Sequence, residues 1–207
     1  RLSFVVYCTK EQRRAIGVIT SWATLTQEVA TCEKCRLCQT RTNVVLGEGD
    51  PHAALMFIGE GPGQQEDLSG RPFVGAAGHL LDKMLAAIGL KREQVYICNI
   101  VKCRPPQNRV PEADERAACL DYLRQQVALV RPKVIVCLGS TPTRMLLGDD
   151  MRITRDRGVW QLKKGVWFMP TYHPAALLRD ADKKRPAWVD FQAIRDKLKE
   201  LGAYAQG

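Results

Sequence analysis

The sequence lacks any apolar run that approaches the roughly 20 residues needed to cross a bilayer as a helix. It also lacks internal repeats and low-complexity segments. Residues 1–7 are too short for a secretory signal and are followed by charged residues. These absences argue against a membrane protein or a repeat array. They predict a location in the cytoplasm, a reducing compartment in which disulfides are rare.

Acidic residues are too few to balance the basic ones. The chain carries 22 Asp and Glu against 31 Lys and Arg, which gives a formal net charge of +9. A basic globular chain is expected to face a polyanion, either a nucleic acid or an acidic surface, although the charge can also serve solubility alone. With 207 residues, 45% of them hydrophobic, the chain is long enough for one well-buried domain but not for two.

Short apolar runs alternate with helical patterns along the chain. Strands are predicted at residues 54–58, 95–100, 134–138 and 166–170. Helices are predicted at residues 78–88, 111–130, 141–147 and 187–201. This alternation predicts an α/β fold with a parallel sheet covered on both faces. Because sites in such sheets lie beyond the carboxyl ends of the strands, the segments that follow the strands should converge on one cleft.

Eight cysteines in a reducing compartment favour metal or reactive chemistry over disulfides. Cys32 and Cys35 form a C-x2-C pair, and Cys103 and Cys119 form a C-x15-C pair far along the chain. Four thiolates from two segments can close one tetrahedral site, and the spacing fits zinc and an iron–sulfur cluster equally. The alternative is that these four cysteines are ordinary buried thiols that bind no metal.

The remaining cysteines have weaker signals. Cys98 and Cys137 lie inside apolar strands and are expected in the core. Cys8 and Cys38 have no evident role, although Cys38 can compete as a ligand.

A cationic, proline-rich loop lies between Cys103 and Cys119. Pinned at both ends, such a loop can be ordered without apolar packing. It is expected to present Lys102, Arg104 and Arg109 to a partner, and phosphate is the natural choice.

Three stretches together resemble the family-4 uracil-DNA glycosylases, the iron–sulfur branch of that superfamily: GEGPGQQEDLSGRPFVGAAGHLL, NIVKCRPPQNRVPEADE and YHPAALLR. The resemblance runs from about residue 32 to residue 179. It implies a three-layer α/β/α sandwich around a four-stranded parallel sheet. It also implies one glycosylase domain over residues 22–207, with an N-terminal extension of uncertain role over residues 1–21. A [4Fe–4S] cluster held by Cys32, Cys35, Cys103 and Cys119 is implied as well, which favours iron over zinc.

The resemblance further implies a monofunctional enzyme that flips uracil out of single- or double-stranded DNA and hydrolyses its N-glycosidic bond. The abasic site would pass to base excision repair. We expect a monomer that associates with the nucleoid and not with a membrane. The alternatives are a non-catalytic or crosslinking reader of uracil and an iron–sulfur protein without base chemistry. A known crosslinking relative carries an inserted basic loop with an extra histidine, which is missing here.

Three residues are expected to hold the flipped base. Phe73 would stack on its ring, unless it is plain core. Asn99 would donate to uracil O4 and accept from N3–H, whereas a generic Asn at a strand end is a turn former. His173 would donate to O2 and stabilise the departing uracil anion.

The loop at residues 59–63, with Gly59 and Gly61, would lie against the base and the attacking water. Better-known relatives carry an aspartate and a tyrosine where this chain has Gly61 and Gly63, so the motif does not identify the group that activates water. Glu60 is our candidate. Glu66 is our candidate for excluding the C5 methyl of thymine, and either acid can instead be structural.

Residues that follow the fourth strand are expected to contact DNA. Small apolar side chains there would fill the hole left by the flipped base, and Arg179, with Arg71, would hold flanking phosphates. The segment also reads as a turn that enters a helix. The wedge is expected at residues 174–178, with Pro174, Ala175, Ala176 and Leu177 as its candidate side chains.

Overall fold

The structure is a computed structural model that describes residues 21–204. Cys8 and all of the predicted N-terminal extension except Ser21 lie outside the described residues. The described part contains a six-stranded sheet with the order β1-β3-β2-β4-β6-β5. Its parallel centre consists of β3 (Tyr96–Asn99), β2 (Leu55–Gly59), β4 (Val134–Leu138) and β6 (Val166–Thr171).

The four predicted strands are confirmed as the parallel centre, but the sheet is mixed and wider than predicted. Two short antiparallel strands extend its edges, β1 (Glu48–Gly49) beside β3 and β5 (Gln161–Lys163) beside β6. These two- and three-residue strands are too short to show an apolar run or an alternation, which explains why the pattern did not reveal them.

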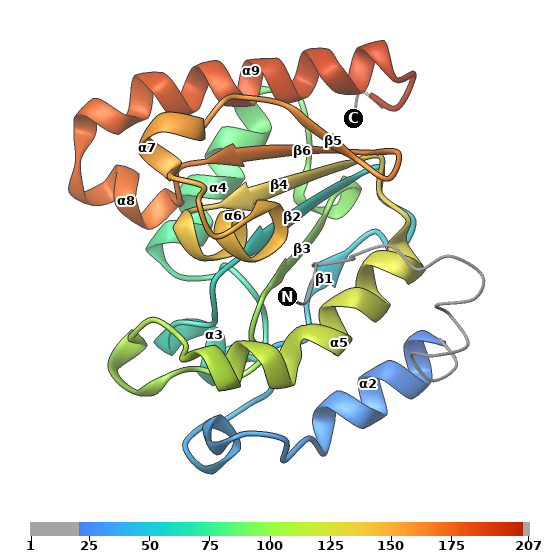
Figure 1. Ribbon diagram of the computed structural model, residues 1–207, viewed down its shortest axis with the longest axis vertical. Helices are drawn as coiled ribbons and strands as arrows, with labels where there is room; N and C mark the ends of the chain where they lie inside the picture. The colour runs from blue at the N-terminus through green and yellow to red at the C-terminus, as the bar shows by residue number, and fades with distance from the viewer. Residues whose placement is uncertain (1–20, 205–207) are drawn as a thin grey trace.

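Helices cover both faces of the sheet, which confirms the three-layer α/β/α fold (Figure 1). Helices α4 (Ala76–Ala87) and α9 (Lys184–Glu200) pack on one face. Helices α2 (Trp22–Ala30), α5 (Ala113–Val130) and α6 (Ser140–Leu147) pack on the other. In the view of Figure 1, α9 lies along the top, whereas α5 and α2 lie below the sheet.

Successive side chains of each central strand enter opposite cores, as the two-residue period of a strand requires. In β2, Leu55 and Phe57 face α4 and α9, whereas Met56 and Ile58 face α5. All four are 2% exposed or less. Both faces of the strand are therefore apolar, and for this reason its sequence is a continuous hydrophobic run.

Short helices follow the carboxyl ends of the central strands. Helix α3 (Gln64–Ser69) follows β2, and α8 (Pro174–Arg179) follows β6. The other short elements are α7 (Ile153–Asp156), η1 (Arg36–Gln39), η2 (Arg92–Gln94), η3 (Pro106–Asn108) and η4 (Ala181–Lys183). Within residues 21–204, no helix combines the length and the apolar character needed to span a membrane.

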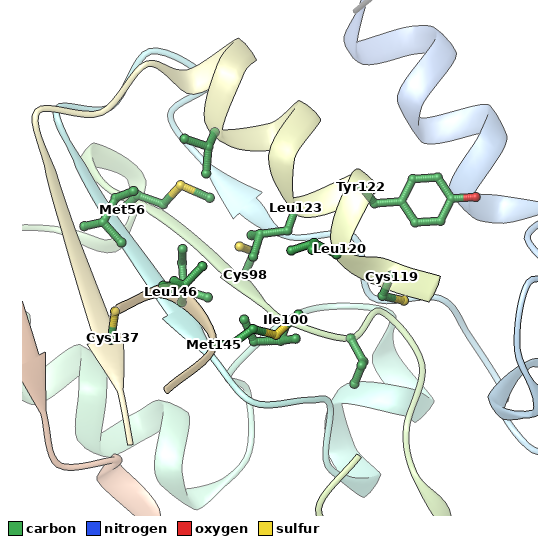
Figure 2. Close-up of a cluster of buried hydrophobic side chains, with 14 of the residues drawn as sticks. Met56, Cys98, Ile100, Cys119, Leu120, Tyr122, Leu123, Cys137, Met145 and Leu146 are labelled. Carbon is green, nitrogen blue, oxygen red and sulfur yellow. The ribbon is translucent and has the colours of Figure 1, made fainter. Parts of the chain in front are cut away.

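Cys98 and Cys137 are core residues, as predicted. Both are fully buried, and Figure 2 shows them among Met56, Ile100 and Leu146. Burial raises the pKa of the Cys137 thiol to about 12 and that of Cys98 above its usual value. Both thiols therefore stay protonated and inert at neutral pH. Cys119 lies at the edge of the same cluster, on α5 (Figure 2).

Candidate active site and thiol pocket

The four central strands end at one cleft with a volume of about 760 Å³. Glu60 follows β2, Asn99 ends β3, Gly139 follows β4 and His173 lies two residues beyond β6, and all four line this cleft. Phe73 joins them from the loop before α4. The predicted convergence of the strand ends is therefore present, and Asn99, Phe73 and His173 line the same cleft.

Asn99 carries an unsatisfied acceptor. The residue is 1% exposed, and its Oδ1 has no hydrogen-bond partner among the described residues. Gly59 makes room for it, because a Cβ at that position would lie 2.3 Å from Oδ1 and 2.6 Å from Cζ of Phe73. A buried carbonyl oxygen without a donor is costly, so the site is suited to a ligand that brings one.

Phe73 stands between the core and the cleft. Its backbone has a left-handed φ of 51°, which is rare for a bulky residue, and its carbonyl accepts a hydrogen bond of 3.1 Å from Nη1 of Arg92. The ring packs against the α4 and α9 core, and it stacks on the ring of His173 with 5.5 Å between centroids. Phe73 is thus both a core residue and a cleft residue. Its stacking on a base stays a prediction.

His173 is held in one tautomer. Its Nδ1 accepts a hydrogen bond of 3.1 Å from the backbone N–H of Ala175, so the proton of the neutral ring is on Nε2. Desolvation and, to a smaller extent, the positive charge of Arg179 lower the pKa of the ring to about 4, while Glu66 opposes the shift. At neutral pH the residue is therefore an uncharged imidazole with an N–H free to donate.

A buried ion pair fixes the strand end that carries His173. Thr171, the last residue of β6, donates a hydrogen bond of 2.6 Å to Oδ2 of Asp190 on α9. Arg157 donates to both carboxylate oxygens of Asp190 and to the carbonyl of Pro186. Because Asp190 is 1% exposed and satisfied by these donors, the segment that leads to His173 has little freedom.

The two candidate acids have different surroundings. Glu60 is half-buried in the cleft, and its Oε2 accepts a hydrogen bond of 2.5 Å from the hydroxyl of Thr141. Glu66 accepts backbone hydrogen bonds from Gly63, Val74 and Gly75 at 2.8 to 3.1 Å. Glu66 therefore ties α3 to the loop before α4, which is a structural duty. Its role against the thymine methyl stays a prediction.

The cations predicted to face phosphate are not all available. Lys102 is a correction: it is 1% exposed and hydrogen-bonded inside the protein, so the loop does not present it. Arg71 does not line the cleft, and within the described residues both hydrogen bonds of its guanidinium go to Glu48. Arg109 lines the cleft but forms a double ion pair with Glu115. Within the described part of the chain, the side chain of Arg104 bonds only to the neutral amide of Asn108.

The α8 segment differs in detail from the predicted wedge. Leu177 is 2% exposed and belongs to the core, so it cannot enter DNA without unfolding α8. Leu178, its neighbour, is 51% exposed. Pro174 is buried, and three residues of the segment line the cleft: Ala175, Ala176 and Arg179.

Two further cations line the cleft that the sequence reading did not identify. Arg144 is exposed on α6, and Lys183 is half-buried in η4. The GSTPTR segment follows a predicted strand, and its position there was a usable signal for Arg144. Lys183 had no such signal, because it lies in a run of basic residues typical of any surface.

The four predicted ligand cysteines line a second, separate pocket. Cys32 and Cys35 enter it from the segment after α2, Cys103 from the loop after β3 and Cys119 from α5. Arg41 spans the two segments, because its Nη1 donates to the Cys32 carbonyl at 2.7 Å and to Sγ of Cys103 at 3.3 Å. Cys38 lines the same pocket.

The donor set suits a cationic or multi-metal group. Burial raises the pKa of Cys103 to about 11 and those of Cys35 and Cys119 above their usual values, so thiolates here need positive charge nearby. Arg41 and Lys102 lie on the wall. Among residues 21–204, no three His, Cys, Asp or Glu side chains converge closely enough to hold a single ion. The thiols surround a space.

Fold and site together define an α/β protein with a polar cleft at the carboxyl edge of its sheet and a separate pocket of thiols. The model of the uracil-DNA glycosylase superfamily matches residues 46–198. The type-4 uracil-DNA glycosylase of Sulfurisphaera tokodaii is 50% identical over 82% of this chain and 81% of its own. That of Thermotoga maritima is 44% identical over 86% and 95%. The chain belongs to the uracil-DNA glycosylase superfamily, in its type-4 group.

Proposed function

We propose that the protein is a monofunctional uracil-DNA glycosylase that removes uracil from DNA and leaves an abasic site for base excision repair. The observation that carries the proposal is the unsatisfied Oδ1 of Asn99, buried in a cleft that it shares with Phe73 and the neutral His173. The names of the curated type-4 relatives support the same activity.

Base selection follows from the amide of Asn99. Oδ1 accepts from N3–H of uracil, while the amide nitrogen donates to O4. Cytosine carries an acceptor at N3 and a donor at its amino group. In the same position its N3 would face the Oδ1 acceptor and its amino group would face the amide donor, so both groups of the Asn99 amide would be left unpaired. The ring of Phe73 stacks on the base and offsets part of the cost of flipping, with roughly 1–3 kcal/mol per stacked base.

Bond cleavage uses the neutral imidazole. As the bond between C1′ and N1 breaks, its electrons move into the uracil ring and onto O2, where Nε2–H of His173 donates a hydrogen bond to the anion. A water then adds to C1′ and its proton is released. Glu60, held by Thr141 at 2.5 Å, is the candidate that orients this water and accepts the proton.

DNA is gripped around the mouth of the cleft. Arg179, Arg144 and Lys183 line it and hold phosphates, together with Arg104 from the loop after β3. Leu178, half-exposed on α8, replaces Leu177 as the side chain that fills the hole in the stack. The substrate is uracil-containing DNA, single- or double-stranded, and the protein acts as a monomer associated with the nucleoid.

The thiol pocket is the proposed site of a [4Fe–4S] cluster held by Cys32, Cys35, Cys103 and Cys119. Four thiols from two segments of the chain suit zinc and an iron–sulfur cluster alike, and the resemblance to the iron–sulfur branch of the family favours the cluster. When bound, the cluster supplies iron–thiolate bonds that join the segment after α2 to α5 and the loop after β3. Hydrolysis of the N-glycosidic bond itself transfers no electrons.

The test is an oligonucleotide assay with uracil opposite guanine, opposite adenine and unpaired. Release of free uracil and an alkali-labile strand supports the proposal. A heat-stable protein–DNA adduct would support a crosslinking reader, and no product from any substrate would reject the activity. Oligonucleotides with cytosine or thymine at the same position are the matched controls, and light scattering with and without DNA measures the oligomeric state.

A further inference from the structure

Arg92 is a largely enclosed arginine that the proposed reaction does not use. It is the first residue of η2, and its side chain is 12% exposed. Its guanidinium donates to two successive backbone carbonyls, to that of Pro72 from Nη2 and to that of Phe73 from Nη1, the second at 3.1 Å. Because Phe73 lines the cleft, Arg92 holds the backbone of a residue that the proposed function places against the base.

Two carboxylates fix the guanidinium. Nε of Arg92 donates to Oε1 of Glu48 at 2.6 Å, and Nη1 also donates to Oδ1 of Asp82 at 3.0 Å. Glu48 lies on β1, at the edge of the sheet, and Asp82 lies on α4. Charge-assisted bonds to a strand and to a helix leave the guanidinium little freedom, so it is a fixed point for the loop that it binds.

The loop that Arg92 binds needs such support. Phe73 has a left-handed φ of 51°, a conformation that persists in a bulky residue only where its surroundings hold it. Its carbonyl lies against α4, since a Cβ at Gly78 would lie 1.8 Å from the carbonyl oxygen. The backbone N–H of the next residue, Val74, donates to Oε1 of Glu66 at 2.9 Å. Arg92 and Glu66 therefore hold the carbonyl and the N–H of one peptide group, which sets its orientation.

The position of the Phe73 ring depends on this backbone. The ring stacks on that of His173 with 5.5 Å between centroids and 28° between planes, and its Cζ would lie 2.6 Å from a Cβ at Gly59. Side-chain rotamers depend on φ and ψ, so a different backbone conformation at residue 73 would move the ring. A moved ring would lose its contact with His173 and its place in the cleft that Asn99 also lines.

We propose that Arg92 is a positioning residue for the flipped base: by binding the Pro72 and Phe73 carbonyls, it holds the Phe73 ring where that ring stacks on uracil. The inference rests on the proposed function, which places the base on this ring. Arg92 is absent from the described residues that line the cleft, so it acts through Phe73 and not by contact with DNA. Its loss should therefore weaken recognition of the base and leave the grip on the DNA backbone unchanged.

The test compares equilibrium binding of two oligonucleotides by the cluster-loaded protein. One carries 2′-fluoro deoxyuridine, whose electron-poor sugar resists cleavage, and the other carries a tetrahydrofuran abasic analogue at the same position. The ratio of the two affinities measures recognition of the base, because only the first has a ring to stack. For Arg92→Met we expect this ratio to fall by about 5- to 20-fold, which is part of the stacking that an aromatic side chain provides.

Arg71→Met is the matched control. Arg71 shares Glu48 with Arg92, but within residues 21–204 its guanidinium bonds only to that carboxylate. This variant therefore loses an ion pair with Glu48 and keeps both carbonyl contacts of Arg92. Its ratio of affinities should equal that of the wild type, whatever happens to the two affinities separately.

A second readout needs neither DNA nor activity. Because the Phe73 ring stacks on His173, its ring current acts on the carbon-bound ring protons of His173. Their chemical shifts should change in Arg92→Met and stay as in the wild type in Arg71→Met. If the wild type releases no uracil and binds both oligonucleotides equally, the proposed function fails, and these shifts alone then decide whether Arg92 holds the ring.

Three results would overturn the inference: a wild-type ratio of affinities in Arg92→Met, an equal loss of both affinities, which would indicate a general structural role, and unchanged shifts of His173. Should Arg92→Met not fold, Arg92→Lys serves in its place. It keeps the charge beside Glu48 and Asp82, but an ammonium has three donors for the four acceptors that Arg92 binds. A lowered ratio in Arg92→Lys supports the inference, and a wild-type ratio rejects it.

Discussion

Chemistry at the cleft depends on the proton positions of single side chains. The backbone N–H of Ala175 occupies Nδ1 of His173, so protonation of the ring would set two N–H groups against each other. Desolvation, with a smaller contribution from the charge of Arg179, acts in the same direction, and the pKa of the ring is about 4. His173 is thus prepared as a neutral donor before any substrate arrives, and no proton has to be removed from it at neutral pH.

We expect the excision rate to show no inflection near pH 6.5 that belongs to His173. The folded pKa of about 4 lies below the ordinary 6.5, so the fold favours the neutral ring. The associated stability is complete above pH 6.5 and is lost as the pH falls from 6.5 to 4. Single-turnover rates and the nitrogen chemical shifts of the ring, measured from pH 4 to 9, check this. Titration of the ring between pH 6 and 7 would contradict it.

His173→Ala should slow release at saturating DNA by about 100-fold or more, as the loss of an anion-stabilising donor does. DNA affinity should change less than about threefold, because the side chain interacts with the reacting base and not with phosphate. Single-turnover rates and equilibrium binding to the same uracil oligonucleotide measure the two effects. A loss of affinity with an unchanged saturating rate would make His173 a binding residue.

Helices and strands set the directions of these side chains. In α8, neighbouring residues serve different purposes, because one packs in the core and the next faces solvent. Leu177 points into the core and Leu178 points out, because adjacent helical residues face different directions. The sequence indicated that this segment touches DNA, yet neighbouring leucines in HPAALLR are equivalent in a pattern. Only the orientation of α8 against the sheet separates them.

The two leucines therefore form a matched pair. Leu178→Ala should reduce excision from duplex DNA by roughly tenfold, with little effect on unpaired uracil or on the melting temperature, because only the duplex has a stack to fill. Leu177→Ala should instead destabilise the fold by about 2–5 kcal/mol through a core cavity. Parallel assays on duplex and single strands, with thermal unfolding, distinguish them. Equal loss on both substrates for Leu178→Ala would reject the wedge.

Interactions at the amino end of α5 contribute a folding stability that depends on pH. Glu115 is fully buried and its carboxylate accepts from Arg109, from the backbone N–H of Glu112 and from Arg36. The bond to Arg109 and these further donors lower its pKa from 4.5 to about 2. The acidic start of α5 thus serves mainly to hold the loop after β3 against α5.

Because the folded pKa of Glu115 is depressed, its contribution is complete above pH 4.5 and is lost as the pH falls toward 2. Allowing for screening at the half-exposed arginines, we expect Glu115→Gln to cost on the order of 2 kcal/mol at pH 7. The difference from the wild type should shrink in urea unfolding between pH 4.5 and 3. A pH-independent difference would show that shape, and not charge, holds this loop.

At the scale of the whole molecule, the sequence predicted the features that leave a periodic hydrophobic pattern. Strands buried on both faces are continuous apolar runs, so the parallel centre, both helical layers and the shared cleft could be foreseen. The fate of the cations could not, because a lysine in a polar loop has the same pattern whether it faces solvent or, as Lys102 does, fills a gap between strand and helix. Edge strands β1 and β5 were missed since they are too short to have a period.

The thiol pocket joins parts of the chain that are far apart in sequence. The segment after α2 contacts the body of the molecule through Arg41 and through Arg36, which bonds to Glu115. Tyr122 on α5 adds a hydrogen bond of 3.5 Å to the carbonyl of Glu28. Leu37 of the same segment is buried in the core, and the backbone N–H groups of Thr42 and Asn43 bond to Asp67, so the proposed cluster would reinforce a segment that already packs on the body of the molecule.

Cys103→Ser and Cys38→Ser test this arrangement, since both thiols line the pocket but only Cys103 is in the proposed ligand set. Cys103→Ser should lose the visible absorption, lower iron from about four per chain toward zero and reduce the melting temperature, because metal binding here is folding free energy. Cys38→Ser should keep iron, colour and stability. Iron and sulfide analysis with thermal unfolding decides between them, and a colourless wild type that contains zinc would replace the cluster by a zinc site.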